Sequence, residues 1–263
     1  MKSPTKYKAK KPDAAGIIHY TAEDNETWGM LMERQLQLIP NRACDEFVQG
    51  LQRLALPTDR IPQLGELNKK LSKYTGWGVE AVPALIGFDR FFALLAEKKF
   101  PIATFIRTRQ ELDYLQEPDI FHEIFGHCPL LTHQSFANFT EIYGQLGLAA
   151  SKEERICLAR LYWMTVEFGL VRSEEGLRIY GGGILSSFSE IKHALESDIP
   201  QRKPFELLDA LRTPYRIDIL QPLYYIIDSM SDLSAISESD IISQAHKAIS
   251  LGLYTPLYTE NSA

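Results

Sequence analysis

The chain has 263 residues, of which 45% are hydrophobic and 24% are charged. This balance is that of an ordinary globular protein and excludes a disordered, fibrous or disulfide-stapled chain. The formal net charge is −6, but five lysines among the first eleven residues leave 23 basic against 34 acidic residues in the rest. Because so acidic a body would repel a phosphate backbone, we expect no nucleic-acid partner.

The cysteines and the apolar segments bear on where the protein works. Cys44, Cys128 and Cys157 are odd in number and show no C-x-x-C spacing, which argues against a disulfide framework and a structural zinc site. A reducing cytoplasm is therefore the expected location. The most apolar stretch, PALIGFDRFFALLA, is interrupted by Asp89 and Arg90, and no apolar signal segment begins the chain. We expect neither secretion nor a membrane span.

The first part of the chain is expected to contain three helices. Thr21 followed by Asp24 is an N-capping pattern, and the helix that it opens is predicted to run to Leu38. Segment 45–56 is a second helical pattern and stops at a proline. Segment 63–74 is a third, and it ends shortly before a glycine, a residue that commonly terminates helices at positive φ.

The rest of the chain is also predominantly helical. Helical patterns cover 88–98, 135–150 and 153–169, whereas 101–107 follows a proline with β-branched and aromatic residues and is predicted to be a short strand. Segment 171–180 resembles a small hairpin. The predicted fold is thus mainly α, an α+β chain with a small amount of sheet.

No repeat, linker or break in composition divides this pattern. We expect residues 1–16 to form a flexible basic tail and residues 17–263 to form one domain.

The stretch EPDIFHEIFGHCPL carries two nearby imidazoles, His122 and His127, at the start of a predicted helix. In the zinc-protease pattern H-E-x-x-H the two histidines are four residues apart, about 40° around an α-helix. Here they are five apart, about 140°. Both rings can therefore face one ion only if the helix is distorted or ends near Gly126. Two histidines without a metal remain the alternative.

A third candidate ligand is Glu167, which interrupts the apolar and aromatic helix YWMTVEFG. A buried carboxylate is costly unless it is paired, and metal coordination is one way to keep it ionised. Together with His122 and His127 it would complete the two-histidine, one-carboxylate set of non-haem Fe(II) oxygenases. A salt bridge from Glu167 to an arginine is the metal-free alternative.

Three segments, EPDIFHEIFGH, YWMTVEFGL and YGGGILSSFSE, resemble the pterin-dependent aromatic amino acid hydroxylases in order and approximate spacing. The similarity extends from about Trp77 to about Tyr225 and is closest to the short bacterial members that act on phenylalanine. It implies a single catalytic domain that converts L-phenylalanine to L-tyrosine with O2, a reduced tetrahydropterin and Fe(II) held by His122, His127 and Glu167.

The resemblance also assigns the substrate pocket. Arg107 would bind the amino-acid carboxylate, Asp119 would orient Arg107, and Ser186 would complete the pocket. Trp163 would wall the substrate ring beside the metal and is counted as a catalytic residue. A bidentate guanidinium suits a planar carboxylate, but a surface arginine and a core tryptophan are the ordinary alternatives.

For the pterin, the resemblance implies stacking on Phe91 and contacts from the backbone of Leu85 and Ile86. Glu123 would lie near the pterin and is also counted as catalytic. Core packing is an equally good interpretation of Phe91. The glycines 181–183 do not form a phosphate-binding motif, and we expect them to permit a tight turn beside the pocket.

The resemblance leaves alternatives. Hydroxylation of tyrosine or tryptophan is the enzymatic one, and a helical binding module that uses the basic tail is the non-enzymatic one. The chain shows no extended C-terminal heptad helix, so we expect a monomer or a small homo-oligomer.

Overall fold

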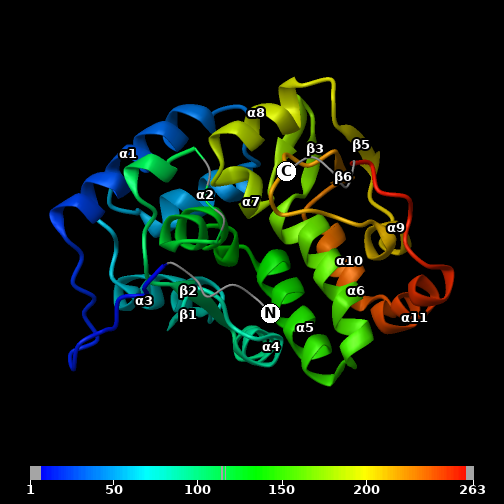
Figure 1. The fold of residues 1–263 in the computed structure, drawn as a ribbon, viewed down its shortest axis with the longest axis horizontal. Coiled ribbons are helices and arrows are strands. Elements are labelled where there is room, and N and C mark those ends of the chain that lie inside the picture. The colour runs from blue at the N-terminus through cyan, green and yellow to red at the C-terminus, as the bar shows by residue number, and fades with distance from the viewer. Residues whose placement is uncertain (1–6, 114, 116, 259–263) are drawn as a thin grey trace.

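A computed structural model describes residues 7–113, 115 and 117–258 of the chain. The first six residues of the predicted basic tail lie outside this set. The fold is mainly α, as predicted, with strands in two small sheets (Figure 1).

Helices of three kinds make up most of the described chain. The α-helices are α1 (Ala22–Leu38), α2 (Asp45–Leu54), α3 (Leu64–Tyr74), α4 (Phe88–Ala96), α5 (Gln134–Ala149), α6 (Lys152–Tyr162), α7 (Gly182–Leu185), α8 (Phe188–Glu196), α9 (Leu207–Arg212), α10 (Asp232–Glu238) and α11 (Ile241–Leu251). The short segments are the 3-10 turns η1 (Arg109–Glu111) and η3 (Leu130–Thr132) and the π-helical segments η2 (His122–His127) and η4 (Trp163–Glu167).

The strands form one two-stranded and one four-stranded sheet. The strands are β1 (Gly78–Val82), β2 (Lys99–Ala103), β3 (Leu170–Ser173), β4 (Gly176–Ile179), β5 (Gln201–Pro204) and β6 (Leu223–Ile227). β1 and β2 are parallel, with Gly78 opposite Lys99. In the other sheet the order is β4-β3-β6-β5, and only β3 and β4 form the predicted antiparallel hairpin.

The three N-terminal helices were predicted close to their observed bounds. Thr21 caps α1: its hydroxyl accepts the Asp24 N–H at 3.1 Å, and the Asp24 carboxylate accepts the Thr21 N–H at 2.7 Å. This reciprocal pair is a capping box. Ala55 ends α2 at φ 39°, and Gly76 follows α3 at φ 76°. The second helix therefore ends two residues before its predicted end at the proline, whereas the third ends at the predicted residue.

The observed strand begins two residues before the predicted strand 101–107 and ends four residues before the predicted end. β2 begins at Lys99 and ends at Ala103, opposite the last residue of β1. Beyond this point the backbone N–H of Arg107 donates to the Asp119 side chain at 2.9 Å rather than to a neighbouring strand. A side chain thus satisfies the donor that the sheet would otherwise have used.

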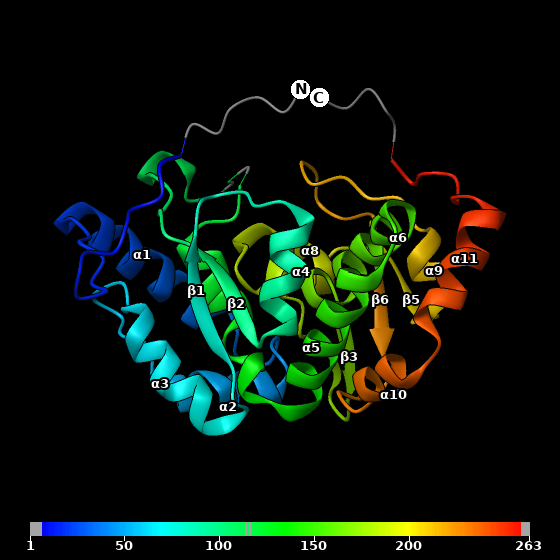
Figure 2. The same cartoon turned by 90° about the horizontal axis from the view of Figure 1, so that it is seen from below.

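One continuous core runs from Ile18 to Ala248. Figure 2 shows α1, α2 and α3 at one end of the molecule and α9, α10 and α11 at the other, with α5 between them. Within the described residues, no helix has both the length and the apolarity needed to cross a bilayer.

Glu190 on α8 is a buried carboxyl that should make stability depend on pH. It is 5% exposed, and burial raises its pKa above the ordinary 4.5 although Tyr224 and the Gln221 N–H donate to it. The native state therefore keeps its proton to higher pH than the unfolded chain, so this stabilisation is present below pH 4.5 and is lost as pH rises. Relative to Glu190→Gln, wild type should lose free energy of unfolding with rising pH. Urea unfolding at several pH values tests this, and a constant difference would contradict it.

Candidate metal centre and active site

The two candidate histidine ligands lie at the ends of η2, which is π-helical. In a π-helix the backbone hydrogen bonds join residues five apart, so such residues lie one turn apart on the same side of the helix. The 140° separation that an α-helix would impose on His122 and His127 is thereby greatly reduced. Their Nε2 atoms are 3.2 Å apart, with the ring planes at 83°. The local distortion that the spacing required is confirmed.

Glu167 completes a compact triangle of donor atoms. Its Oε1 is 3.3 Å from His127 Nε2, and its Oε2 is 3.7 Å from His122 Nε2. An ion with bonds of about 2.1 Å in an octahedron places adjacent ligands about 3.0 Å apart and opposite ligands about 4.2 Å apart. The Nε2–Nε2 distance and the distance from His127 to Glu167 are close to the adjacent spacing. The three side chains can therefore share one face of an ion and leave the opposite face open, as in non-haem Fe(II) oxygenases.

The charge states of these groups also suit a metal ion. Burial lowers the pKa of His122 to about 4, so its ring is neutral and its nitrogen can act as a ligand. Burial alone would raise the pKa of Glu167, but His127 and His122 hold it below its ordinary value, which keeps the carboxylate ionised. The donor set therefore fits a divalent cation.

A second carboxyl, Glu123, lies beside this triangle, and one of its oxygens is within 4.8 Å of the ring nitrogens of both His122 and His127. Burial, reinforced by the nearby Glu167 and Asp119 carboxylates, raises its pKa well above the ordinary value. A protonated carboxyl is a poor metal ligand but can donate a hydrogen bond. Glu167, whose pKa is held below its ordinary value, is therefore the better candidate for the third ligand.

Ser186 orients His122. Its hydroxyl donates to the Gly182 carbonyl at 2.9 Å, and its oxygen lies 2.8 Å from His122 Nδ1. Because the single hydroxyl proton is already used, Ser186 must accept from Nδ1–H. The proton on Nδ1 leaves Nε2 free for a metal, a common arrangement behind metal-binding histidines. The structure thus gives Ser186 a contact with the metal site that the sequence did not indicate.

The glycines 181–183 were predicted to permit a tight turn, and this prediction was wrong. They allow close packing instead. Gly181 has an ordinary φ of −67°, and none of the three glycines has a positive φ. A Cβ on Gly182 would lie 2.4 Å from Cε1 of His127, and one on Gly126 would lie 2.7 Å from the Gly182 carbonyl. α7 therefore packs directly on η2 and on the ring of His127.

Arg107 and Asp119 form a buried bidentate pair. Nε and Nη2 of Arg107 donate to the two Asp119 oxygens, both at 2.8 Å, and the exposed fractions of the side chains are 7% and 0%. Asp119 also accepts the His122 backbone N–H at 3.0 Å. One carboxylate therefore links the arginine to the first turn of the metal-binding helix. Among the described residues, Nη1 of Arg107 makes no hydrogen bond, so its N–H groups can donate to a ligand.

If this arginine holds the substrate carboxylate, Arg107→Lys should raise the KM for the amino acid about 10- to 100-fold, because the ammonium group of lysine cannot pair with Asp119 through two N–H groups and still present another to the substrate carboxylate. Steady-state kinetics measures the effect. Arg109→Lys is the matched control, since Arg109 is 46% exposed and pairs with Glu26 on the surface. Equal KM values for the two variants would contradict the assignment.

Trp163 opens η4, the π-helical segment that ends at Glu167. Its ring stacks on Tyr215 with centroids 4.4 Å apart and planes at 14°, and its indole N–H donates to Gln221 Oε1 at 3.0 Å. Tyr215 and Gln221 were not identified from the sequence. They follow α9 by several residues, and only the folded chain brings them to Trp163.

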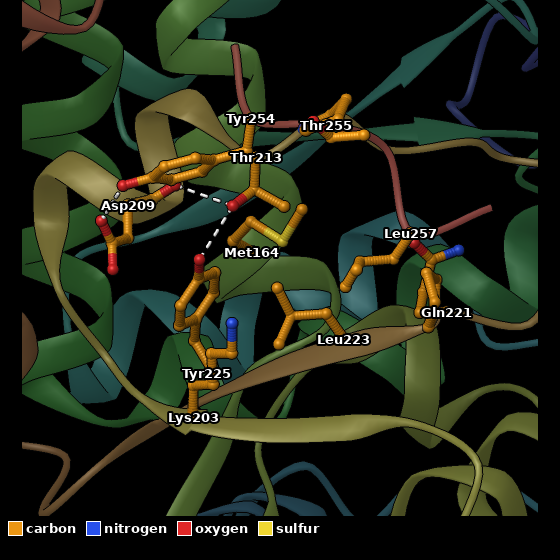
Figure 3. A pocket seen from close by; sticks show the side chains of 12 residues that line it. Met164, Lys203, Asp209, Thr213, Gln221, Leu223, Tyr225, Tyr254, Thr255 and Leu257 are labelled. Atoms are coloured by element: carbon orange, nitrogen blue, oxygen red, sulfur yellow. Dashed lines mark hydrogen bonds between the residues drawn. The ribbon is translucent and has the colours of Figure 1, made fainter.

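A cavity of about 450 Å³ lies among residues of α9, β6 and the C-terminal segment (Figure 3). Met164 and Gln221 line it, together with Leu223, Tyr225 and residues of the C-terminal segment. None of the predicted site residues is among its lining, so the cavity is separate from the metal centre.

The residues predicted for the pterin lie at the start of α4 and before it. Phe91 is half-buried and meets Tyr162 edge to face, with centroids 5.4 Å apart. Leu85 is 51% exposed and Ile86 is half-buried. Tyr162 directly precedes Trp163, which places Phe91 near the same end of η4. Their role toward a pterin remains a prediction.

Fold and site together define a helical enzyme built around a two-histidine, one-carboxylate metal centre. A family model described as biopterin-dependent aromatic amino acid hydroxylase matches residues 2–248, and the chain belongs to this family.

Individual relatives align with this chain over nearly their whole length. A phenylalanine-4-hydroxylase of Pseudomonas aeruginosa is 57% identical over 259 residues, which cover 98% of each chain. The apo structure of a cold-active phenylalanine hydroxylase from Colwellia psychrerythraea has 57% identity and a TM-score of 0.93, with 95% of this chain and 97% of that chain covered. Chromobacterium violaceum phenylalanine hydroxylase with bound oxidised Fe(III) has 43% identity and a TM-score of 0.90, with 96% and 92% covered.

Proposed function

We propose that this protein is a phenylalanine 4-monooxygenase, which converts L-phenylalanine to L-tyrosine with O2, a tetrahydropterin and Fe(II). The observation that carries the proposal is the cluster of donor groups from His122, His127 and Glu167. The two Nε2 atoms are 3.2 Å apart, Oε1 of Glu167 is 3.3 Å from His127 Nε2, and Oε2 of Glu167 is 3.7 Å from His122 Nε2. The full-length relative from Pseudomonas aeruginosa is a phenylalanine-4-hydroxylase, and a related Chromobacterium violaceum structure holds oxidised Fe(III). The names of these relatives support phenylalanine as the substrate and iron as the metal.

His122, His127 and Glu167 would hold the iron. When bound, iron and the reduced pterin activate O2 for insertion of one oxygen atom into the aromatic ring. Ser186 holds the proton on His122 Nδ1 so that Nε2 faces the ion. The packing of Gly182 against His127 keeps the second ring in place.

The remaining residues would bind and orient the reactants. Arg107, fixed by Asp119, presents a free N–H to the amino-acid carboxylate, and Trp163 walls the aromatic ring. On the pterin side, Phe91 would stack on the heterocycle, the backbone of Leu85 and Ile86 would contact its edge, and a protonated Glu123 would donate a hydrogen bond. Such positioning brings the reacting groups together and excludes water.

Substrate choice among the aromatic amino acids is tested by product analysis. Iron-loaded protein is supplied with tetrahydropterin, O2 and, in turn, phenylalanine, tyrosine and tryptophan. We expect the highest kcat/KM for phenylalanine, with tyrosine as the product. A preference for tyrosine or tryptophan would overturn the substrate assignment and retain the family reaction.

A further inference from the structure

Gln221 is a buried glutamine, 2% exposed, and both the nitrogen and the oxygen of its side-chain amide form hydrogen bonds. Nε2 donates to the carbonyl oxygens of Arg216 and Ile219, both at 2.9 Å, and so closes the loop that leads into β6. Oε1 accepts the indole N–H of Trp163 at 3.0 Å. Because both Nε2 protons are engaged, Oε1 cannot exchange places with Nε2 without breaking these bonds.

The backbone of Gln221 is anchored as well. Its N–H donates to Glu190 Oε1 at 3.0 Å, and its carbonyl oxygen lies 3.2 Å from Nε2 of His193. Both partners belong to α8. The acceptor for Trp163 is therefore held by a helix and a closed loop that do not depend on Trp163 itself.

The other contacts of Trp163 are less directional. The ring is stacked on Tyr215 and lies against Phe168, with centroids 4.6 Å apart and planes at 32°. Stacked rings can slide and rotate in their own plane at little cost, whereas a hydrogen bond weakens steeply as its angle departs from linear. The bond to Gln221 is thus the contact that sets the in-plane orientation of the indole.

We propose that Gln221 is a positioning residue that acts through Trp163 and fixes the angle at which the indole walls the substrate ring. This inference rests on the proposed function. Without the bond the indole would rotate and the substrate ring would lose its single orientation. The pterin would then give up two electrons to O2, which takes up two protons and leaves as hydrogen peroxide, without forming tyrosine.

The test compares Gln221→Met, which keeps the side-chain volume and removes the amide, with wild type. Of the three hydrogen bonds that this change removes, only the one to the indole reaches Trp163, and we expect its loss to raise the KM for phenylalanine about fivefold to tenfold. The loss of the two Nε2 bonds to the loop should lower stability. Tyrosine formed per pterin oxidised should fall, with the difference recovered as peroxide. In ¹⁵N-tryptophan spectra the Trp163 indole resonance, assigned by its absence in Trp163→Phe, should move upfield and exchange faster with solvent.

Thr213→Val is the matched control. Thr213 Oγ1 and Tyr225 Oη share a hydrogen bond of 2.8 Å in the wall of the same cavity as Gln221 (Figure 3). Removing this bond should lower stability and leave coupling and the Trp163 resonance unchanged. In a Trp163→Phe background, Gln221→Met should add no further uncoupling, since the donor is already gone.

Two results would overturn the inference. One is a Gln221→Met enzyme whose coupling and Trp163 resonance both match wild type. The other, which does not need the Gln221 variant to fold, is a wild-type Trp163 indole proton that exchanges as fast as an exposed indole. Failure of the proposed function is recognised separately, because wild type would then make no tyrosine while the indole measurement still stands.

Discussion

Glu167→Gln should lose Fe(II) binding by more than about 100-fold and lose tyrosine formation with it. The substitution preserves shape but replaces a carboxylate ligand by a neutral amide, and even partners behind metal ligands are worth about 10- to 100-fold. The variant should fold, because Glu167 already lies 14% exposed at the metal face. Iron content after anaerobic reconstitution, together with the product assay, measures the effect.

Glu190→Gln provides the matched control, since it makes the same change at another glutamate with a mostly buried side chain. Glu190 contacts Tyr224 and the Gln221 backbone, not the histidines. This variant should bind iron as wild type does. If Glu167→Gln binds iron stoichiometrically, Glu167 is not a ligand, and Glu123 becomes the candidate for the third ligand.

Gly182→Ala is expected to have the second large effect. The added methyl carbon would lie 2.4 and 2.5 Å from Cε1 and Nδ1 of His127. The ring has little room to retreat, because it is 1% exposed and lies against Phe100 at 5.0 Å between centroids. The variant should lose about 1–3 kcal/mol of stability through overpacking, and its iron affinity should fall because His127 moves.

Gly65→Ala is the comparison for this substitution. Gly65 lies in α3 without positive φ, and a Cβ there meets no atom within 4 Å. Alanine should stabilise that helix by about 0.5–1 kcal/mol. Thermal unfolding of both variants with and without Fe(II) separates the two contributions. A Gly182→Ala protein with unchanged stability and unchanged iron binding would refute the close-packing interpretation of the glycine run.

The candidate metal ligands could be identified from the sequence because their chemistry is visible in residue type and spacing. Two imidazoles five residues apart required a distorted helix, and η2 supplies one in π-helical form. Glu167 was recognisable as a carboxylate within an apolar helix. The N-terminal helices were likewise predictable, since caps such as Thr21 act within a few residues of their targets.

Features that depend on distant segments were not predictable. β6 is buried at all five positions and pairs with β3 and β5, so it shows no alternation of apolar and polar residues. The acceptor for Trp163 lies 58 residues further along the chain. The role of Gly182 depends on a ring in another element, and a local pattern showed only that a glycine was present.

Tyrosine formation by reconstituted wild-type protein tests the central claim most directly. Protein is loaded with Fe(II) without oxygen and then given phenylalanine, tetrahydropterin and O2, with iron or pterin omitted in parallel and Glu167→Ala as the variant. We predict tyrosine only when iron and pterin are both present, and almost none from the variant. Tyrosine formed without pterin, or a wild-type protein that binds no iron, would contradict the assignment of this chain as an iron- and pterin-dependent phenylalanine hydroxylase.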